Sequence, residues 1–136
     1  MNRLARHRVG RETRLRVLIA EDIGGSRQLL ASLLRQVAPE VEIHEVTDGA
    51  DVVETHRRLE PQITFLDIGL PNKTGLEVLH EIRVDDAASF IVIVSAHSQA
   101  EVITKAVALS VDGFVVKPYS PQRIVEALDR FRARRS

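Results

Sequence analysis

The stretch QITFLDIGLPNKTGLEVLHEI, residues 62–82, places three structural signals in direct succession. Its opening run is largely apolar up to Asp67, which is typical of a buried strand. Residues 69–75 are rich in glycine, proline and asparagine, as in a loop. Apolar residues at the spacing of one helical face come next: Leu76, Leu79 and Ile82. The stretch therefore predicts a strand, a loop and a helix, which is the repeating unit of an α/β fold.

The same alternation occurs five times along the chain. Runs that predict strands lie at residues 15–20, 41–46, 62–67, 90–94 and 113–117. A helical pattern follows each run, the second at roughly residues 50–59. In the other helices we expect these side chains to face inward: Leu29, Leu30, Leu33, Leu34, Val37, Leu76, Leu79, Ile82, Val102, Ile103, Ala106, Val107, Ile124, Val125, Leu128 and Phe131. Strands that alternate with helices in this way predict right-handed crossovers and a parallel sheet.

The apolar content of the strands predicts their order. The runs RVLIA, ITFL and FIVIV, in the first, third and fourth strands, are nearly continuous. Such strands are covered by helices on both faces of a sheet. The second strand, VEIHEV at 41–46, alternates apolar and polar residues, which places it at an edge. We therefore predict a flavodoxin-like (βα)5 three-layer sandwich with parallel strand order 2-1-3-4-5.

Composition bounds the class of protein. The 136 residues suit one domain, and 44% hydrophobic with 28% charged residues is the balance of a globular protein. The absence of cysteine excludes disulfides and thiolate metal sites. No apolar run approaches the roughly 20 residues that span a bilayer. We therefore expect a cytoplasmic protein that does not bind membranes.

The charge is uneven although the net charge is zero. Residues 1–16 hold six arginines against one glutamate, and residues 129–136 hold four arginines against one aspartate. Basic segments can bind nucleic acid, but no aromatic residue lies among the N-terminal arginines, so a solvated surface is favoured over a nucleic-acid contact. We predict a basic, flexible tail over residues 1–14 and a folded domain over residues 15–134.

Polar side chains lie where four predicted strands end: Glu21 and Asp22, Asp67, Ser95 and Lys117. Each has an ordinary explanation by itself, as a turn former, a satisfied hydroxyl or a surface charge. Together they indicate a site, because ligands of open parallel sheets bind beyond the carboxyl ends of the strands. Crowded carboxylates suit Mg²⁺, and an ammonium beside them can neutralise a phosphoryl group. An aspartate can then act as the nucleophile.

These residues resemble the receiver domains of two-component signalling. The resemblance rests on Glu21-Asp22, on Asp67 in FLDIGLPNKTG, on Ser95 in IVSAHS, on Phe114 and on Lys117-Pro118. Asp22 lies 45 positions before Asp67, and Lys117 lies 50 positions after it. The resemblance covers residues 15–134.

The resemblance implies a role for each residue of the motif. Asp67 is the phosphoacceptor, and Mg²⁺, with Mn²⁺ as a substitute, is held by Asp22, Asp67 and the backbone carbonyl of Gly69, with Glu21 acting indirectly. Lys117 pairs with a phosphoryl oxygen, and its peptide bond to Pro118 is cis. Ser95 and Phe114 form the switch, which changes the surface of the fourth helix, the fifth strand and the fifth helix.

Four positions depart from the commonest pattern of the family. Glu21 stands where aspartate is more frequent, and Ser95 where threonine is frequent. Gly69 and His97 lie two residues after Asp67 and Ser95, at places that tend to tune the loss of the phosphoryl group. Glycine has no side chain that could keep water from the phosphoryl group or bond to it, so the sequence does not predict how long the phosphoryl group lasts. His97 is interpreted equally well as a surface residue.

The function predicted from the resemblance is a phosphorylation-activated signalling switch rather than an enzyme. Its expected partners are a sensor histidine kinase or phosphotransfer protein and a downstream protein, with a homodimer possible on phosphorylation. The alternative is a small aspartyl-phosphate phosphotransferase or phosphatase, which usually carries a second aspartate where this chain has Gly69. An FMN-binding flavodoxin is disfavoured by the two acids after the first strand. With no output domain in the sequence, a stand-alone regulator is favoured over an excised receiver.

Overall fold

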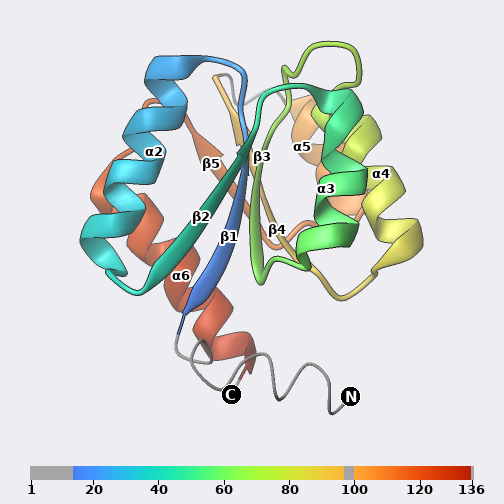
Figure 1. Cartoon of the computed structure of the whole chain (residues 1–136). Coiled ribbons are helices and arrows are strands. Elements are labelled where there is room, and N and C mark those ends of the chain that lie inside the picture. Colours follow the sequence, from blue (N-terminus) through green and yellow to red (C-terminus); the bar gives the residue numbers. More distant parts are fainter. Residues whose placement is uncertain (1–13, 97–99, 136) are drawn as a thin grey trace.

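The computed structural model describes residues 14–96 and 100–135 and contains a sheet of five parallel strands (Figure 1). The strands are β1 (Leu15–Ala20), β2 (Val41–Val46), β3 (Ile63–Asp67), β4 (Phe90–Ser95) and β5 (Gly113–Val116). Their order is β2-β1-β3-β4-β5. This order confirms the flavodoxin-like arrangement predicted from the sequence.

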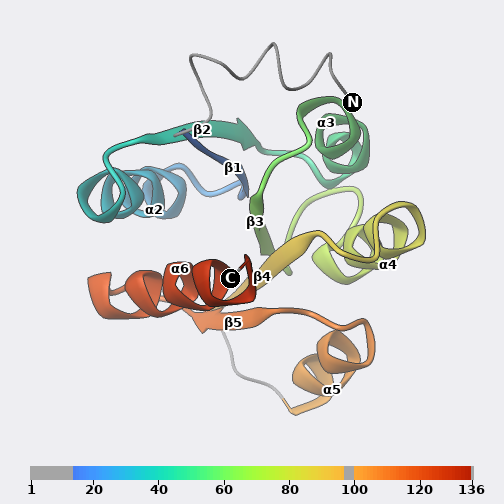
Figure 2. The same ribbon diagram turned by 90° about the horizontal axis from the view of Figure 1, so that it is seen from below.

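Helices cover both faces of the sheet. They are α2 (Gly24–Val37), α3 (Val52–Leu59), which follows the short 3-10 helix η1 (Gly49–Asp51), α4 (Gly75–Asp85), α5 (Ala100–Ala108) and α6 (Pro121–Arg135). Figures 1 and 2 show α2 and α6 on one face and α3, α4 and α5 on the other. The molecule is therefore a three-layer α/β/α sandwich.

Alternation along β1 fills the cores on both faces. Val17 and Ile19 belong to the cluster under α2 and α6, whereas Leu18 and Ala20 belong to the cluster under α3, α4 and α5. This division follows from the strand geometry, because successive side chains point to opposite faces. All four side chains are at most 1% exposed. Full burial of each larger one stabilises the fold by about 1.5–3 kcal/mol.

Three residues predicted to face inward are instead exposed. Leu29 is 43% exposed, Val107 65% and Val125 39%. In α2 and α6 the small residues Ala31 and Ala127, which the apolar pattern did not indicate, lie on the buried face instead. The apolar spacing alone did not locate the centre of these faces.

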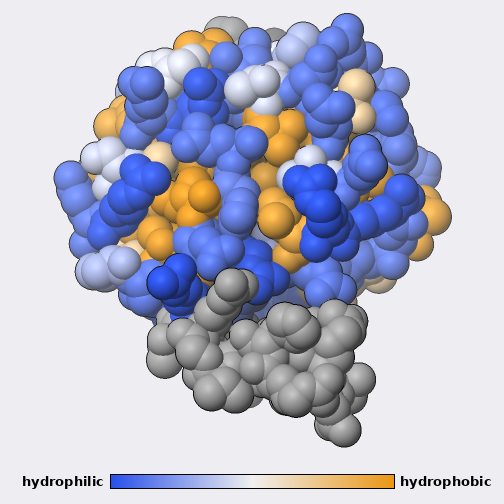
Figure 3. Space-filling view, in the orientation of Figure 1, coloured by the Kyte–Doolittle hydropathy of each residue, from blue (hydrophilic) through white to orange (hydrophobic). Residues whose placement is uncertain are grey.

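The edge strand β2 carries charged side chains that form ion pairs. Arg16 lies 3.6 Å from Glu42, and Arg27 of α2 lies 2.7 Å from Glu45. Figure 3 accordingly shows hydrophilic side chains over most of this face, with smaller hydrophobic patches between them. Charged edges discourage pairing with a second sheet.

Within the described ranges, 14–96 and 100–135, no helix is long and apolar enough to cross a bilayer.

The hydroxyl of Thr64, in β3, is a polar group buried in the hydrophobic core. Thr64 is 0% exposed, and its Oγ1 has no hydrogen-bond partner among the described residues. An unpaired buried hydroxyl costs about 1–3 kcal/mol. We therefore expect Thr64→Val to raise the free energy of unfolding by about 1 kcal/mol in urea denaturation. The control is Thr47→Val at an exposed loop position, which is expected to change it by less than about 0.5 kcal/mol. A destabilised Thr64→Val protein would contradict the prediction.

Candidate functional site

The first three predicted acids meet at one end of the sheet. The parallel register pairs Ala20 of β1 with Leu66 of β3, so the residues that follow, Glu21 and Asp67, lie side by side. Carboxylate oxygens of Glu21, Asp22 and Asp67 lie within 4.8 Å of one another. These strand ends are at the top of the sheet in Figure 1, opposite the last turns of α6.

The carboxylate of Asp67 is buried and held on both oxygens. The residue is 5% exposed. Its Oδ1 accepts a hydrogen bond of 3.1 Å from the backbone N–H of Gly69, and its Oδ2 lies 3.2 Å from Nζ of Lys117. These contacts fix the direction in which a further group can approach the carboxylate.

The loop after Asp67 is tied down at its far end. The N–H of Gly75 donates to the carbonyl of Ile68 at 2.9 Å, which brings the start of α4 against the end of β3. Thr74 and Glu77 form a capping box that begins α4, with reciprocal bonds of 3.2 and 2.9 Å. Gly75 and Thr74 of the motif thus hold the backbone that carries Asp67.

Lys117 bridges the two buried acids. Its Nζ lies 2.6 Å from Oε1 of Glu21 and 3.2 Å from Oδ2 of Asp67, and its side chain is 13% exposed. Burial lowers the pKa of Lys117, but bonding and charge from Glu21 and Asp67 outweigh this and raise it overall. Lys117 is therefore a fixed cation beside Asp67. The peptide bond between Lys117 and Pro118 is cis.

The acids of the pair after β1 have different surroundings. Glu21 is 1% exposed, and burial raises its pKa, as does the nearby Asp67, while Lys117 opposes the rise. Asp22 is exposed. A cation from solvent can therefore reach the cluster from the side of Asp22.

The donor set fits a hard divalent cation. Three carboxylates gather within reach of one ion, and Mg²⁺ is bound by oxygen ligands of this kind. Lys117 compensates part of their charge, and a divalent cation would compensate the remainder. The backbone of Gly69 lies beside Asp67, as its 3.1 Å bond to Oδ1 requires. The carboxylates of Glu21, Asp22 and Asp67 are therefore the groups within reach of such an ion, and a role for the Gly69 carbonyl stays a prediction.

The predicted switch residues lie further along the same sheet. Ser95 ends β4, is 7% exposed, and accepts a 2.8 Å backbone bond from the N–H of Lys117. Phe114 lies in β5 opposite Ile93, is half-buried, and packs against the cluster under α3, α4 and α5. His97 lies outside the described residues.

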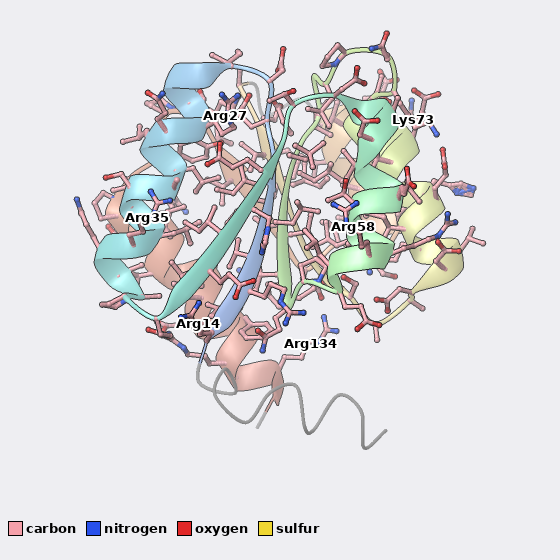
Figure 4. All side chains as sticks on the ribbon, in the orientation of Figure 1. Arg14, Arg27, Arg35, Arg58, Lys73 and Arg134 are labelled. Atoms are coloured by element: carbon pink, nitrogen blue, oxygen red, sulfur yellow. The ribbon has the colours of Figure 1, made fainter. Side chains whose placement is uncertain are left out.

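Two residues that contact the site were not predicted. The hydroxyl of Tyr119 donates to Oε1 of Glu21 at 3.3 Å. Arg27, at the upper end of α2 in Figure 4, donates from Nη1 to the backbone carbonyls of Glu21 at 3.1 Å and Asp22 at 3.4 Å. Tyr119 follows Lys117-Pro118 directly, which was the available signal, whereas nothing in the sequence singles out Arg27.

Comparisons with known proteins agree on one family. A family model described as "Response regulator receiver domain" matches residues 17–129. The chain is 34% identical over 115 residues to the chemotaxis protein CheY of Thermotoga maritima, covering 85% of this chain and 95% of the relative. It is 30% identical to the chemotaxis protein CheY of Bacillus subtilis over the same shares of each. Its structure matches a DNA-binding response regulator of the LuxR family from Staphylococcus aureus with a TM-score of 0.79 and 31% identity, covering 86% and 98% of the chains.

Proposed function

Because the chain belongs to the response regulator receiver domain family, we propose that it is a signalling switch activated by phosphorylation of Asp67. The observation that carries this proposal is the arrangement around one buried carboxylate. One oxygen of Asp67 lies 3.2 Å from the ammonium of Lys117, and carboxylate oxygens of Glu21, Asp22 and Asp67 lie within 4.8 Å of one another. An aspartate with a fixed cation and a place for a metal has what phosphoryl transfer requires.

The reaction joins a carboxylate oxygen of Asp67 to the phosphorus of a phosphohistidine. As the new O–P bond forms, the P–N bond breaks and its electron pair returns to the imidazole of the donor. Lys117 stays beside the incoming group and pairs with one phosphoryl oxygen. Bound Mg²⁺, or Mn²⁺ in its place, would neutralise further charge on the phosphoryl oxygens. The donor is a sensor histidine kinase or a phosphotransfer protein, so the chain acts as a regulatory acceptor rather than as a turnover enzyme.

The output passes through the surface of α5, β5 and α6. Ser95 and Phe114 connect the site to this surface, because Ser95 pairs with Val116 and Ile93 pairs with Phe114 in the β4–β5 ladder. Figure 2 shows β5 at the sheet edge with α5 and α6 beside it. Val107, Val116 and Val125 are exposed there. A downstream protein, or a second copy of the phosphorylated chain, would bind this surface.

The absence of cysteine fits the cytoplasmic location predicted above.

The test is direct phosphorylation. Acetyl phosphate and Mg²⁺ should add one base-labile phosphoryl group to the wild-type chain, detected as a mass increase. Beryllofluoride, which mimics the phosphoryl group, should change the association state or the exposure of the α5–β5–α6 surface. If acetyl phosphate adds no phosphoryl group and beryllofluoride changes neither the association state nor the exposure of the surface, the proposal is overturned. Hydrolysis of many phosphomonoesters per chain would favour a phosphatase instead.

Asp22→Asn should weaken Mg²⁺ binding. The substitution removes a charged oxygen ligand while keeping the size of an exposed side chain. Even the outer hydrogen-bond partners of metal ligands contribute about 10–100-fold to affinity, so we expect a loss of at least about tenfold by calorimetry. Asp51→Asn, at an exposed position in η1, is the control and should leave the affinity unchanged. Equal Mg²⁺ affinities for the two variants would remove Asp22 from the metal site.

A further inference from the structure

The Glu21 carboxylate has donors on both oxygens. Oε1 accepts from Nζ of Lys117 at 2.6 Å and from the hydroxyl of Tyr119 at 3.3 Å. Oε2 accepts from the backbone N–H of Ile23 at 3.2 Å. With the residue 1% exposed, these donors replace the water that would otherwise solvate the charge. The side chain is therefore held in one orientation, with Oε1 toward Lys117.

Tyr119 makes this contact from a buried position in the core. The residue is 8% exposed, and its ring belongs to the cluster under α2 and α6. From this cluster its hydroxyl reaches Glu21, which is 98 positions earlier in the sequence. Buried tyrosines usually find a partner for the hydroxyl, and here that partner is a group of the phosphorylation site.

The orientation of Glu21 determines the position of Lys117. The ammonium is closer to Glu21, at 2.6 Å, than to Asp67, at 3.2 Å. A freely rotating Glu21 would carry Lys117 with it and move the ammonium away from Asp67. Because phosphoryl transfer depends on positioning, a displaced ammonium slows the reaction.

We propose that Tyr119 is a positioning residue of the phosphorylation site: its hydroxyl holds the Glu21 carboxylate so that Glu21 serves as the anchor of Lys117. The inference rests on the proposed function and adds a role that the strand-end motif does not contain. Glu21 then contributes to the site through Lys117, while Asp22 and Asp67 would hold the metal.

The first test is Tyr119→Phe, which keeps the ring and removes the hydroxyl. At saturating Mg²⁺ and acetyl phosphate, we expect phosphorylation to be about three- to tenfold slower, as for the loss of one long charge-assisted hydrogen bond. The Mg²⁺ dissociation constant, measured by calorimetry, should change by less than about twofold because the metal ligands remain. A residue that acts through packing alone would leave both quantities unchanged, and this result would overturn the inference.

A double-variant cycle separates positioning from other effects. In the Glu21→Ala background, Tyr119→Phe should change the phosphorylation rate by less than about twofold, because no carboxylate remains to be held. An equal effect in both backgrounds would show that Tyr119 acts without Glu21 and would overturn the inference.

The metal-free protein gives a readout that does not depend on phosphorylation. The two single substitutions should lower Tm by more in sum than the double variant does, because each breaks the same contact. Additive shifts would overturn the inference even if phosphorylation occurs. If the wild-type chain is not phosphorylated at all, the proposed function fails, while non-additive shifts would still support the Tyr119–Glu21 contact.

Discussion

Asp67→Asn is expected to abolish phosphorylation by acetyl phosphate and Mg²⁺. The amide has nearly the size of the carboxylate, but it lacks the charge that makes Asp67 a nucleophile and attracts the ammonium of Lys117 at 3.2 Å. Intact-mass measurement should show the base-labile adduct on the wild type and none on the variant. We expect no residual activity at this position, since nothing replaces the attacking oxygen.

The controls distinguish the acceptor from the site as a whole. Asp85→Asn changes a surface aspartate that pairs with Arg57, and this variant should be phosphorylated at the wild-type rate. Asp22→Asn should still form the adduct when Mg²⁺ is raised to compensate for weaker binding. An adduct that persists in Asp67→Asn and disappears in Asp22→Asn would place the acceptor at Asp22 instead.

The strands were well predicted because their composition is dominated by burial. β1 and β2 have the predicted bounds, β3 begins one residue later than predicted, at Ile63, and β5 ends one residue earlier, at Val116. Strand order was predictable for a related reason: the edge strand β2 is half-buried and alternates, whereas β3 and β4 are buried throughout. A helix face is harder to locate, because alanine at Ala31 or Ala127 gives a weak apolar signal even where it is fully packed.

The candidate site was predicted as a set of residues but not as a set of contacts. Parallel strands bring their carboxyl ends to one edge, so topology alone collects Glu21, Asp67 and Lys117. That Lys117 lies nearer Glu21 than Asp67 depends on the packing of individual side chains, which no periodicity in the sequence reveals.

A hydrogen-bond network around Arg83, at the other end of the sheet, was likewise not predicted from the sequence. The guanidinium of Arg83 donates to the carbonyls of Ser89 at 2.7 Å, Ser110 at 2.8 Å and Leu109 at 3.0 Å, and it pairs with Asp112 at 3.2 Å. These partners join α4 to the loops before β4 and β5. Arginine on a helix is usually a surface residue, so its pattern in the sequence did not indicate this role.

Gly75→Ala should damage both the fold and the phosphorylation site. Gly75 begins α4, and a Cβ added there would lie 2.2 Å from the carbonyl oxygen of Asp67 and 2.7 Å from Cα of Ile68. Gly75 does not have a left-handed φ, so space rather than backbone conformation requires the glycine. Because both neighbours are backbone atoms, the end of β3 must move. Overpacking of this kind costs about 3 kcal/mol, and we expect urea denaturation to show a loss of this size.

Gly25→Ala is the matched control, because a Cβ at that position in α2 meets no atom within 4 Å. Alanine is the better helix former, so the free energy of unfolding should stay the same or rise by up to about 1 kcal/mol. For the folded fraction of Gly75→Ala, the displaced Asp67 should also be phosphorylated more slowly at saturating Mg²⁺ and acetyl phosphate, whereas Gly25→Ala should react at the wild-type rate. Equal stability and equal rates for the two variants would mean that the close approach of α4 to Asp67 does not constrain the acceptor. A loss of stability in Gly75→Ala without a loss of rate would confine the role of this glycine to the fold.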